Sequence, residues 1–76
     1  MNKQRRKELE RAKSLLEEAM DIIQTAADDE REYAENMPES MQESEKHELA
    51  EETADNLEGV ASDIEGVISS LEEAYE

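Results

Sequence analysis

The chain has 76 residues, with 23 acidic against 8 basic side chains and a formal net charge of −15. Only 36% of the residues are hydrophobic and two are aromatic, so a single folded copy would have a thin core. Cysteine is absent, which excludes a disulfide scaffold and a zinc site with cysteine ligands. No apolar run reaches the roughly 20 residues of a membrane span and the N-terminus lacks the apolar stretch of a signal peptide, so we expect a cytoplasmic protein.

Charge is distributed unevenly along the chain. Six of the eight basic residues lie within the first 13 positions, which carry a net charge of +4. Residues 14–76 hold the other two basic residues and 21 of the acidic ones. The sequence therefore describes a polyanion with a basic tip at its N-terminus.

Apolar residues recur with a helical period in the first half of the chain. The steps alternate between three and four residues, as on one face of an amphipathic helix. This pattern predicts a helix over about 3–36. The stripe consists of Leu9, Ala12, Leu16, Ala19, Ile23, Ala26, Glu30, Tyr33 and Met37.

A second stripe predicts another helix. Between the two stripes Pro38 disfavours helical geometry at Met37, so we expect a turn over about 36–40. Ser40 and Glu43 match the Ser-x-x-Glu capping box, which predicts a second helix starting at about Pro38 or Ser40 and ending near Tyr75. The second stripe consists of Ala50, Ala54, Leu57, Ala61, Ile64, Ile68, Leu71 and Tyr75.

The two stripes can pair in antiparallel fashion about a fold point near Ser40. Leu9 then lies opposite Leu71 and Leu16 opposite Ile64, and the fold point falls inside the predicted turn. We therefore predict one all-α domain over 1–76, an antiparallel two-helix hairpin of coiled-coil type. Because half of its seam is alanine, we also expect the hairpin to self-associate into a helical bundle.

Two polar features are expected to support the hairpin. A seam residue that is polar can set the register of two helices, and four residues near the turn could form such a cluster: Glu30, Tyr33, Lys46 and His47. The basic tip can pair with the acidic end of the second helix, or it can be a solvated, frayed tail. The pairing would join Arg5, Arg6 and Lys7 to Glu72, Glu73 and Glu76.

A row of small residues follows the second helix on the side away from its apolar stripe. Two glycines within a helix cost about 1 kcal/mol each relative to alanine, so an ordinary solvated face would carry Glu or Lys instead. The row predicts close approach by a second copy or by a partner protein. The alternative is that these small residues are tolerated sequence drift without a function. Its members are Gly59, Ser62, Gly66 and Ser69.

Catalytic and metal-binding motifs are absent. The segment that starts at His47 begins like the zinc-protease motif His-Glu-x-x-His but has Glu51 where the second histidine belongs. There is one histidine, so a di-iron helical bundle is excluded, and no glycine-rich phosphate loop is present. We expect no enzymatic activity, no cofactor and no metal site.

The acidic surface predicts a protein partner. Neutralising phosphates requires spread Lys and Arg, so direct binding to nucleic acid is not expected. A net −15 over roughly 50 Å gives about one charge per 3.3 Å, and two copies side by side would approach the 1.7 Å of duplex DNA. This density suggests mimicry of nucleic acid towards a protein with a basic surface. The expected contact residues are Glu51, Glu58, Glu65 and Glu72 in one heptad row, with Glu52 and Glu73 beside them.

The block Asn-Met-Pro-Glu-Ser-Met-Gln at 36–42, followed by Asp-Asn-Leu-Glu at 55–58, resembles a group of small acidic proteins of phages and mobile elements of Gram-positive bacteria. The resemblance implies an inhibitor of a host nuclease, a CRISPR effector or another defence protein, acting in the bacterial cell. The alternative is a structural or assembly adaptor that works through a helical-bundle interface and the small-residue row.

Overall fold

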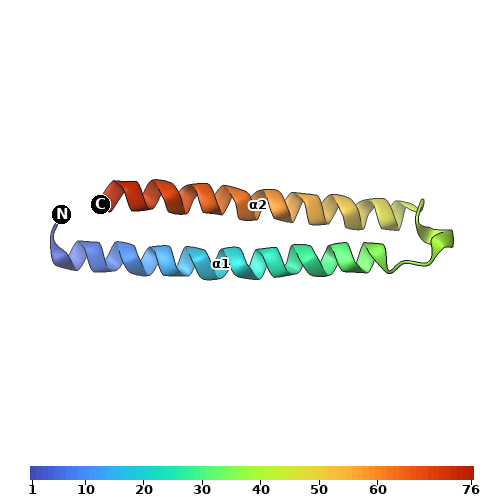
Figure 1. Ribbon diagram of the computed structural model, residues 1–76, viewed down its shortest axis with the longest axis horizontal. Helices are drawn as coiled ribbons and strands as arrows, with labels where there is room; N and C mark the ends of the chain where they lie inside the picture. Colours follow the sequence, from blue (N-terminus) through green and yellow to red (C-terminus); the bar gives the residue numbers. More distant parts are fainter.

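The computed structural model describes all 76 residues as two long helices that lie side by side and run antiparallel (Figure 1). Helix α1 spans Lys3–Glu35 and helix α2 spans Glu45–Tyr75, with the short 3-10 turn η1 at Glu39–Met41 between them. No strand is present, and the two helices pack against each other along their length. The predicted all-α helical hairpin is therefore confirmed.

The hairpin is a narrow rod with both chain ends at the same tip. Its extents are 60 × 15 × 12 Å, and Figure 1 shows the N- and C-termini close together at the end opposite the loop. The basic start of α1 therefore lies beside the acidic end of α2. The remaining length of the rod carries most of the negative charge.

Helix α1 has the limits that the sequence predicts. The Asn2 side chain caps its start by accepting a hydrogen bond from the Arg5 backbone N–H at 2.7 Å. At the other end, the Asn36 N–H donates to the Glu32 carbonyl at 2.9 Å and closes the last turn. The helix stops there because Pro38 follows two residues later and disfavours helical geometry at Met37.

Helix α2 starts later than the predicted Pro38 or Ser40, so the predicted Ser40 to Glu43 capping box is wrong. Ser44 is the N-cap, and its Oγ accepts from the His47 N–H at 3.2 Å. The chain needs the extra residues to cross from one helix axis to the other, about 8–10 Å away. Residues 39–41 form η1, and the Ser44 Oγ also donates to the Met41 carbonyl at 2.7 Å.

The seam follows the predicted stripe on α2, and on α1 it keeps Leu9, Leu16, Ile23, Glu30 and Met37. It moves by one residue at the alternate positions Ala26 and Tyr33. Ala27 and Ala34 are buried, whereas the predicted Ala26 is exposed and the Tyr33 side chain is 46% exposed. The shift puts small side chains at the seam, and Ala27 and Ala54 both have 0% exposure. Close approach of two helices favours alanine at these positions, because a tyrosine ring would hold them apart.

The core is thin throughout. No large side chain is fully buried, and the main buried cluster near the loop consists of Ala34, Met37 and Ala50, with Met41 packed against it. Leu9, Leu16 and others along the seam are only half-buried. One hairpin therefore leaves much of its apolar surface in water, and seven large hydrophobic side chains are exposed: Met1, Leu15, Ile22, Tyr33, Leu49, Val60 and Val67.

Candidate acidic interaction face

One side of the seam, here named the acidic face, is defined by the ion pairs that cross it. Lys13 and Arg31 of α1 both reach α2 on this side. Residues seven apart repeat the same position on a helix. Steps of seven from Arg31 on α1, and from Glu58 and Glu72 on α2, therefore give the row of residues that flanks the seam on each helix. The rows are Glu10, Glu17, Gln24 and Arg31 on α1, and Glu51, Glu58, Glu65 and Glu72 on α2.

Arg31 connects the two helices through a fork of two carboxylates. Its Nη2 lies 2.8 Å from Oδ1 of Asp55 and 3.0 Å from Oε1 of Glu58, and its Nε donates to the same Glu58 oxygen at 3.2 Å. The hydrogen bond that Arg31 donates to Asp55, followed by the one it donates to Glu58, raises the pKa of its guanidinium above the ordinary value. The planar guanidinium suits this arrangement because its donors form a rigid fork.

Lys13 makes the second cross-helix ion pair, near the chain ends. Its Nζ lies 3.5 Å from Oε1 of Glu72. The negative charge of Glu72 raises the pKa of Lys13, while partial desolvation opposes the rise. These two pairs hold Glu58 and Glu72 at the edge of the seam rather than free in solvent.

The predicted contact glutamates therefore divide into two groups. Glu58 and Glu72 have a cation across the seam, whereas Glu51 and Glu65 have none on the other helix. Glu51 lies 3.6 Å from Nε2 of His47 within α2. The remaining two predicted contacts, Glu52 and Glu73, are exposed on the side of α2 that points away from α1.

The predicted polar cluster near the loop is wrong. His47 is buried at 8% exposure, but its ring lies next to Glu51 of its own helix. Tyr33 points towards solvent because the seam passes through Ala34 instead. No hydrogen bond or ion pair joins any two of the four residues that were expected to meet, Glu30, Tyr33, Lys46 and His47.

The predicted ion pairs at the tip are also wrong in their partners. Arg5 and Lys7 form no ion pair, and the Arg6 guanidinium lies over the Tyr75 ring, 5.8 Å from its centre. Glu72 is bound by Lys13, one helical turn or more further along α1. The sequence did contain a signal that Arg31 binds acidic residues of the second helix, because it is one of only two cations beyond the tip.

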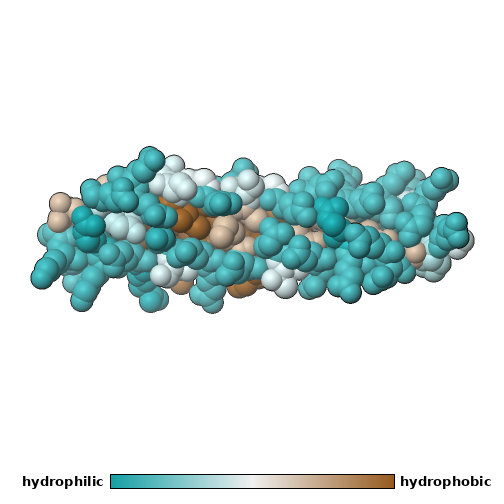
Figure 2. Space-filling model, in the orientation of Figure 1, coloured by the Kyte–Doolittle hydropathy of each residue, from teal (hydrophilic) through white to brown (hydrophobic).

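Charge is separated along the rod as well as around it. At the tip, residues 1–13 lie beside 68–76, and their six cations offset five anions. The rest of the rod, residues 14–67, carries 18 acidic and two basic side chains. Figure 2 shows one long face on which hydrophilic residues predominate, with tan and brown along the line between the helices and brown at the lower edge.

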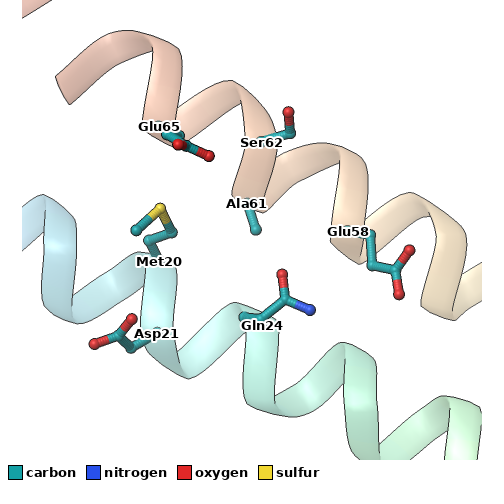
Figure 3. Close-up of a pocket in the computed structure, with 7 residues that line it drawn as sticks. All are labelled: Met20, Asp21, Gln24, Glu58, Ala61, Ser62 and Glu65. Atoms are coloured by element: carbon teal, nitrogen blue, oxygen red, sulfur yellow. The ribbon is translucent and has the colours of Figure 1, made fainter. Parts of the chain in front are cut away.

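A shallow cavity of about 230 Å³ lies on the acidic face. Figure 3 shows Met20 and Glu65 pointing towards each other across the seam, while Asp21 points away from α2. No group of three or more His, Asp or Glu side chains is close enough to hold a metal ion. The cavity is lined by Met20, Asp21, Gln24, Glu58, Ala61, Ser62 and Glu65.

The small-residue row on α2 is open to solvent. Gly59 and Gly66 are exposed, and a Cβ atom added to either would meet nothing within 4 Å. Ser69 is also exposed, and Ser62 borders the cavity. Close approach to this row by another chain stays a prediction.

Comparisons with protein-family models, with curated proteins and with solved structures give no significant match. Neither helix has an apolar stretch that would suffice to cross a membrane. The fold and the charge distribution thus define the chain as a helical hairpin with one acidic face.

Proposed function

We propose that this protein is a non-enzymatic binder that places its acidic face on the basic surface of another protein. The partner is one that otherwise holds a nucleic-acid backbone, such as a nuclease, a CRISPR effector or another defence factor. Residues 14–67, with 18 acidic and two basic side chains, are the observation that carries this proposal. The resemblance of the 36–42 block to small phage proteins supports the setting, a bacterial cell under infection.

The density of charge supports competition with nucleic acid. The rod from residue 14 to the loop is about 40 Å long, so a net −16 corresponds to one charge per about 2.5 Å. Duplex DNA has about one per 1.7 Å. A rod of this density attracts basic grooves over distance and accelerates association at low salt.

The proposal predicts that nucleic acid and salt each displace a bound partner from the acidic face. Partners captured from nuclease-treated bacterial lysate should be released by added duplex DNA or guide RNA, and by about 0.5 M salt, where the Debye length is only a few ångströms. Binding that survives both treatments contradicts a nucleic-acid mimic.

Charge reversal can locate the contact without damaging the hairpin. Glu51→Lys combined with Glu65→Lys alters the acidic face but leaves both cross-helix ion pairs intact. Glu18→Lys combined with Glu32→Lys makes the same change in net charge on the exposed outer side of α1. We expect the first variant to lose most of its binding and the second to retain it.

A structural or assembly adaptor is the second candidate, favoured by the open surface at Gly59 and Gly66. An adaptor that docks there would be blocked by large side chains at these glycines and would be indifferent to the acidic-face reversals. The same capture assay, run with Gly59→Gln and Gly66→Gln, separates the two functions.

A further inference from the structure

Six of the seven exposed large hydrophobic side chains gather on the side of the seam opposite the acidic face. A step of two residues along a helix turns by about 200°, so Ile22 lies across the helix from Gln24. Val60 and Val67 are related in the same way to Glu58 and Glu65. We name this side the apolar face; its large members are Leu15, Ile22, Tyr33, Leu49, Val60 and Val67.

These side chains lie at matching heights on the two helices. Met20 and Gln24 line the same cavity as Glu58 and Ala61, so Ile22 and Val60 lie at one level. The Lys13 to Glu72 pair places Leu15 near the level of Val67. The space between them on α1 is filled by alanines, so the apolar face is continuous across both helices: Ala12, Ala19 and Ala26 occupy the flanking row.

The two faces differ sharply in charge. On the flanking rows next to the seam, the apolar face has Ala, Thr, Tyr and Val, with charge only at Arg5 and Lys46 near the ends of the helices. The acidic face has seven charged residues in the same places. The outer rows of the apolar face are mixed, because Asp29 lies in line with Leu15 and Ile22, and Asp63 lies in line with Leu49. A surface with an apolar centre and a polar rim is typical of a protein–protein interface.

The area of this face suits an interface between two copies. One hairpin exposes 5712 Å², and a long face is about a quarter of that surface, or about 1400 Å². A stable interface buries about 800 Å² per partner, so the face is large enough. A second hairpin also supplies the core that one lacks, since no large side chain is fully buried in a single copy.

The charge along the rod determines the relative direction of the two copies. The tip, where the chain ends meet, is close to neutral, whereas residues 14–67 are strongly negative. Two rods with their loops at the same end would place the polyanionic portions side by side. Opposite directions place each basic N-terminal segment next to the acidic loop end of the other copy, which reduces the repulsion.

We propose that the apolar face binds a second copy of this chain, related by a two-fold axis, to form a four-helix bundle with the two loops at opposite ends. The two acidic faces then lie on opposite outer sides of the bundle and stay available. The bundle is independent of the proposed function, because neither Glu51 nor Glu65 takes part in it.

Sedimentation equilibrium of the full chain tests the bundle. At high micromolar concentration and about 0.5 M salt, where repulsion is screened, we expect twice the 8.7 kDa of one chain. Ile22→Glu combined with Val60→Glu should return the mass to that of one chain. Both side chains are exposed, at 64% and 44%, so helicity measured by circular dichroism should persist at the low temperature of the run.

A matched variant identifies the face. Gly59→Glu combined with Gly66→Glu also adds two negative charges to the hairpin, but on the small-residue row, where an added side chain has open space. We expect this variant to remain a dimer. A monomeric wild type overturns the proposal, and so does dissociation by the glycine variant while the Ile22 and Val60 variant stays dimeric.

Cross-linking tests the direction, because the chain has no cysteine of its own. Ala19→Cys lies near the middle of the apolar face, and a short bismaleimide should join two copies through it. Glu39→Cys lies in the loop at one end of a 60 Å rod and should not cross-link. Efficient joining through residue 39 contradicts the opposed arrangement, and failure at residue 19 contradicts the proposed face.

Discussion

Arg31 and Asp55 are 24 residues apart in the chain, and they meet across the seam with 2.8 Å between Nη2 and Oδ1. The same guanidinium binds Glu58, so one cation holds two carboxylates of a strongly acidic helix. The hairpin contains few other polar links between α1 and α2. Arg31 therefore contributes to register as well as to charge balance.

Removing this cation should weaken the hairpin. Arg31→Gln leaves Asp55 and Glu58 facing each other without a partner, so we expect a lower Tm, with the loss largest at low salt. Arg11→Gln on the outer side of α1, where the side chain is exposed and forms no ion pair, is the control. Equal melting of the two variants would show that the fork has no structural role.

Filling the glycine positions of α2 should stabilise the protein. Gly59→Ala and Gly66→Ala place a Cβ where nothing lies within 4 Å, and each should add about 1 kcal/mol through helix propensity alone. Thermal melting at fixed protein concentration measures the gain. Destabilisation, or loss of partner binding, would show that another chain approaches these glycines closely.

Which of two neighbouring alanines of α1 faces the seam can be tested by making the same substitution at each. Ala27→Leu inserts bulk at a site with 0% exposure and should cost about 1–3 kcal/mol. Ala26→Leu is exposed in a single hairpin and, at a protein concentration low enough to keep the chain monomeric, should change stability by about 0.5 kcal/mol or less. Chemical denaturation compares them, and the reverse order of effects would support the predicted stripe through Ala26.

The start of α2 has a similar test. Ser44→Ala removes the oxygen that accepts from the His47 N–H and should destabilise the protein by about 1 kcal/mol. Ser40 lies inside η1, and Ser40→Ala should have an effect of about 0.5 kcal/mol or less. Urea unfolding of both variants decides which serine caps the helix.

The Lys13 to Glu72 pair predicts how stability depends on alkaline pH. Glu72 raises the pKa of Lys13 in the folded protein. The stabilisation of the fold by this ion pair is therefore complete below the ordinary pKa of lysine, and it is lost as pH rises through the raised pKa. The Tm difference between wild type and Lys13→Met should therefore be constant from neutral to mildly alkaline pH and shrink above it.

Lys7→Met provides the control for that series, because Lys7 forms no ion pair. Its Tm difference from wild type should be smaller at neutral pH. A Lys13 effect that grows with pH would contradict the assigned cause.

Much of the fold follows from local chemistry that the sequence displays directly. The 3.6-residue period predicts both helices, and Pro38 ends the first. The antiparallel pairing follows because two stripes of similar length lie on either side of one turn. The acidic rows and the basic tip are likewise visible as heptad spacing and composition. These features depend on residues close together in the chain.

Only the packed structure decided the features that depend on distance between the helices. The seam moved from Ala26 and Tyr33 to Ala27 and Ala34, because small side chains let the helices approach and a heptad pattern with alanines at adjacent positions fits either register. The partners of Arg31 and Lys13 depend on that register. The opposition of the acidic and apolar faces likewise arises only when two helices pack, since a face of a hairpin is built from both.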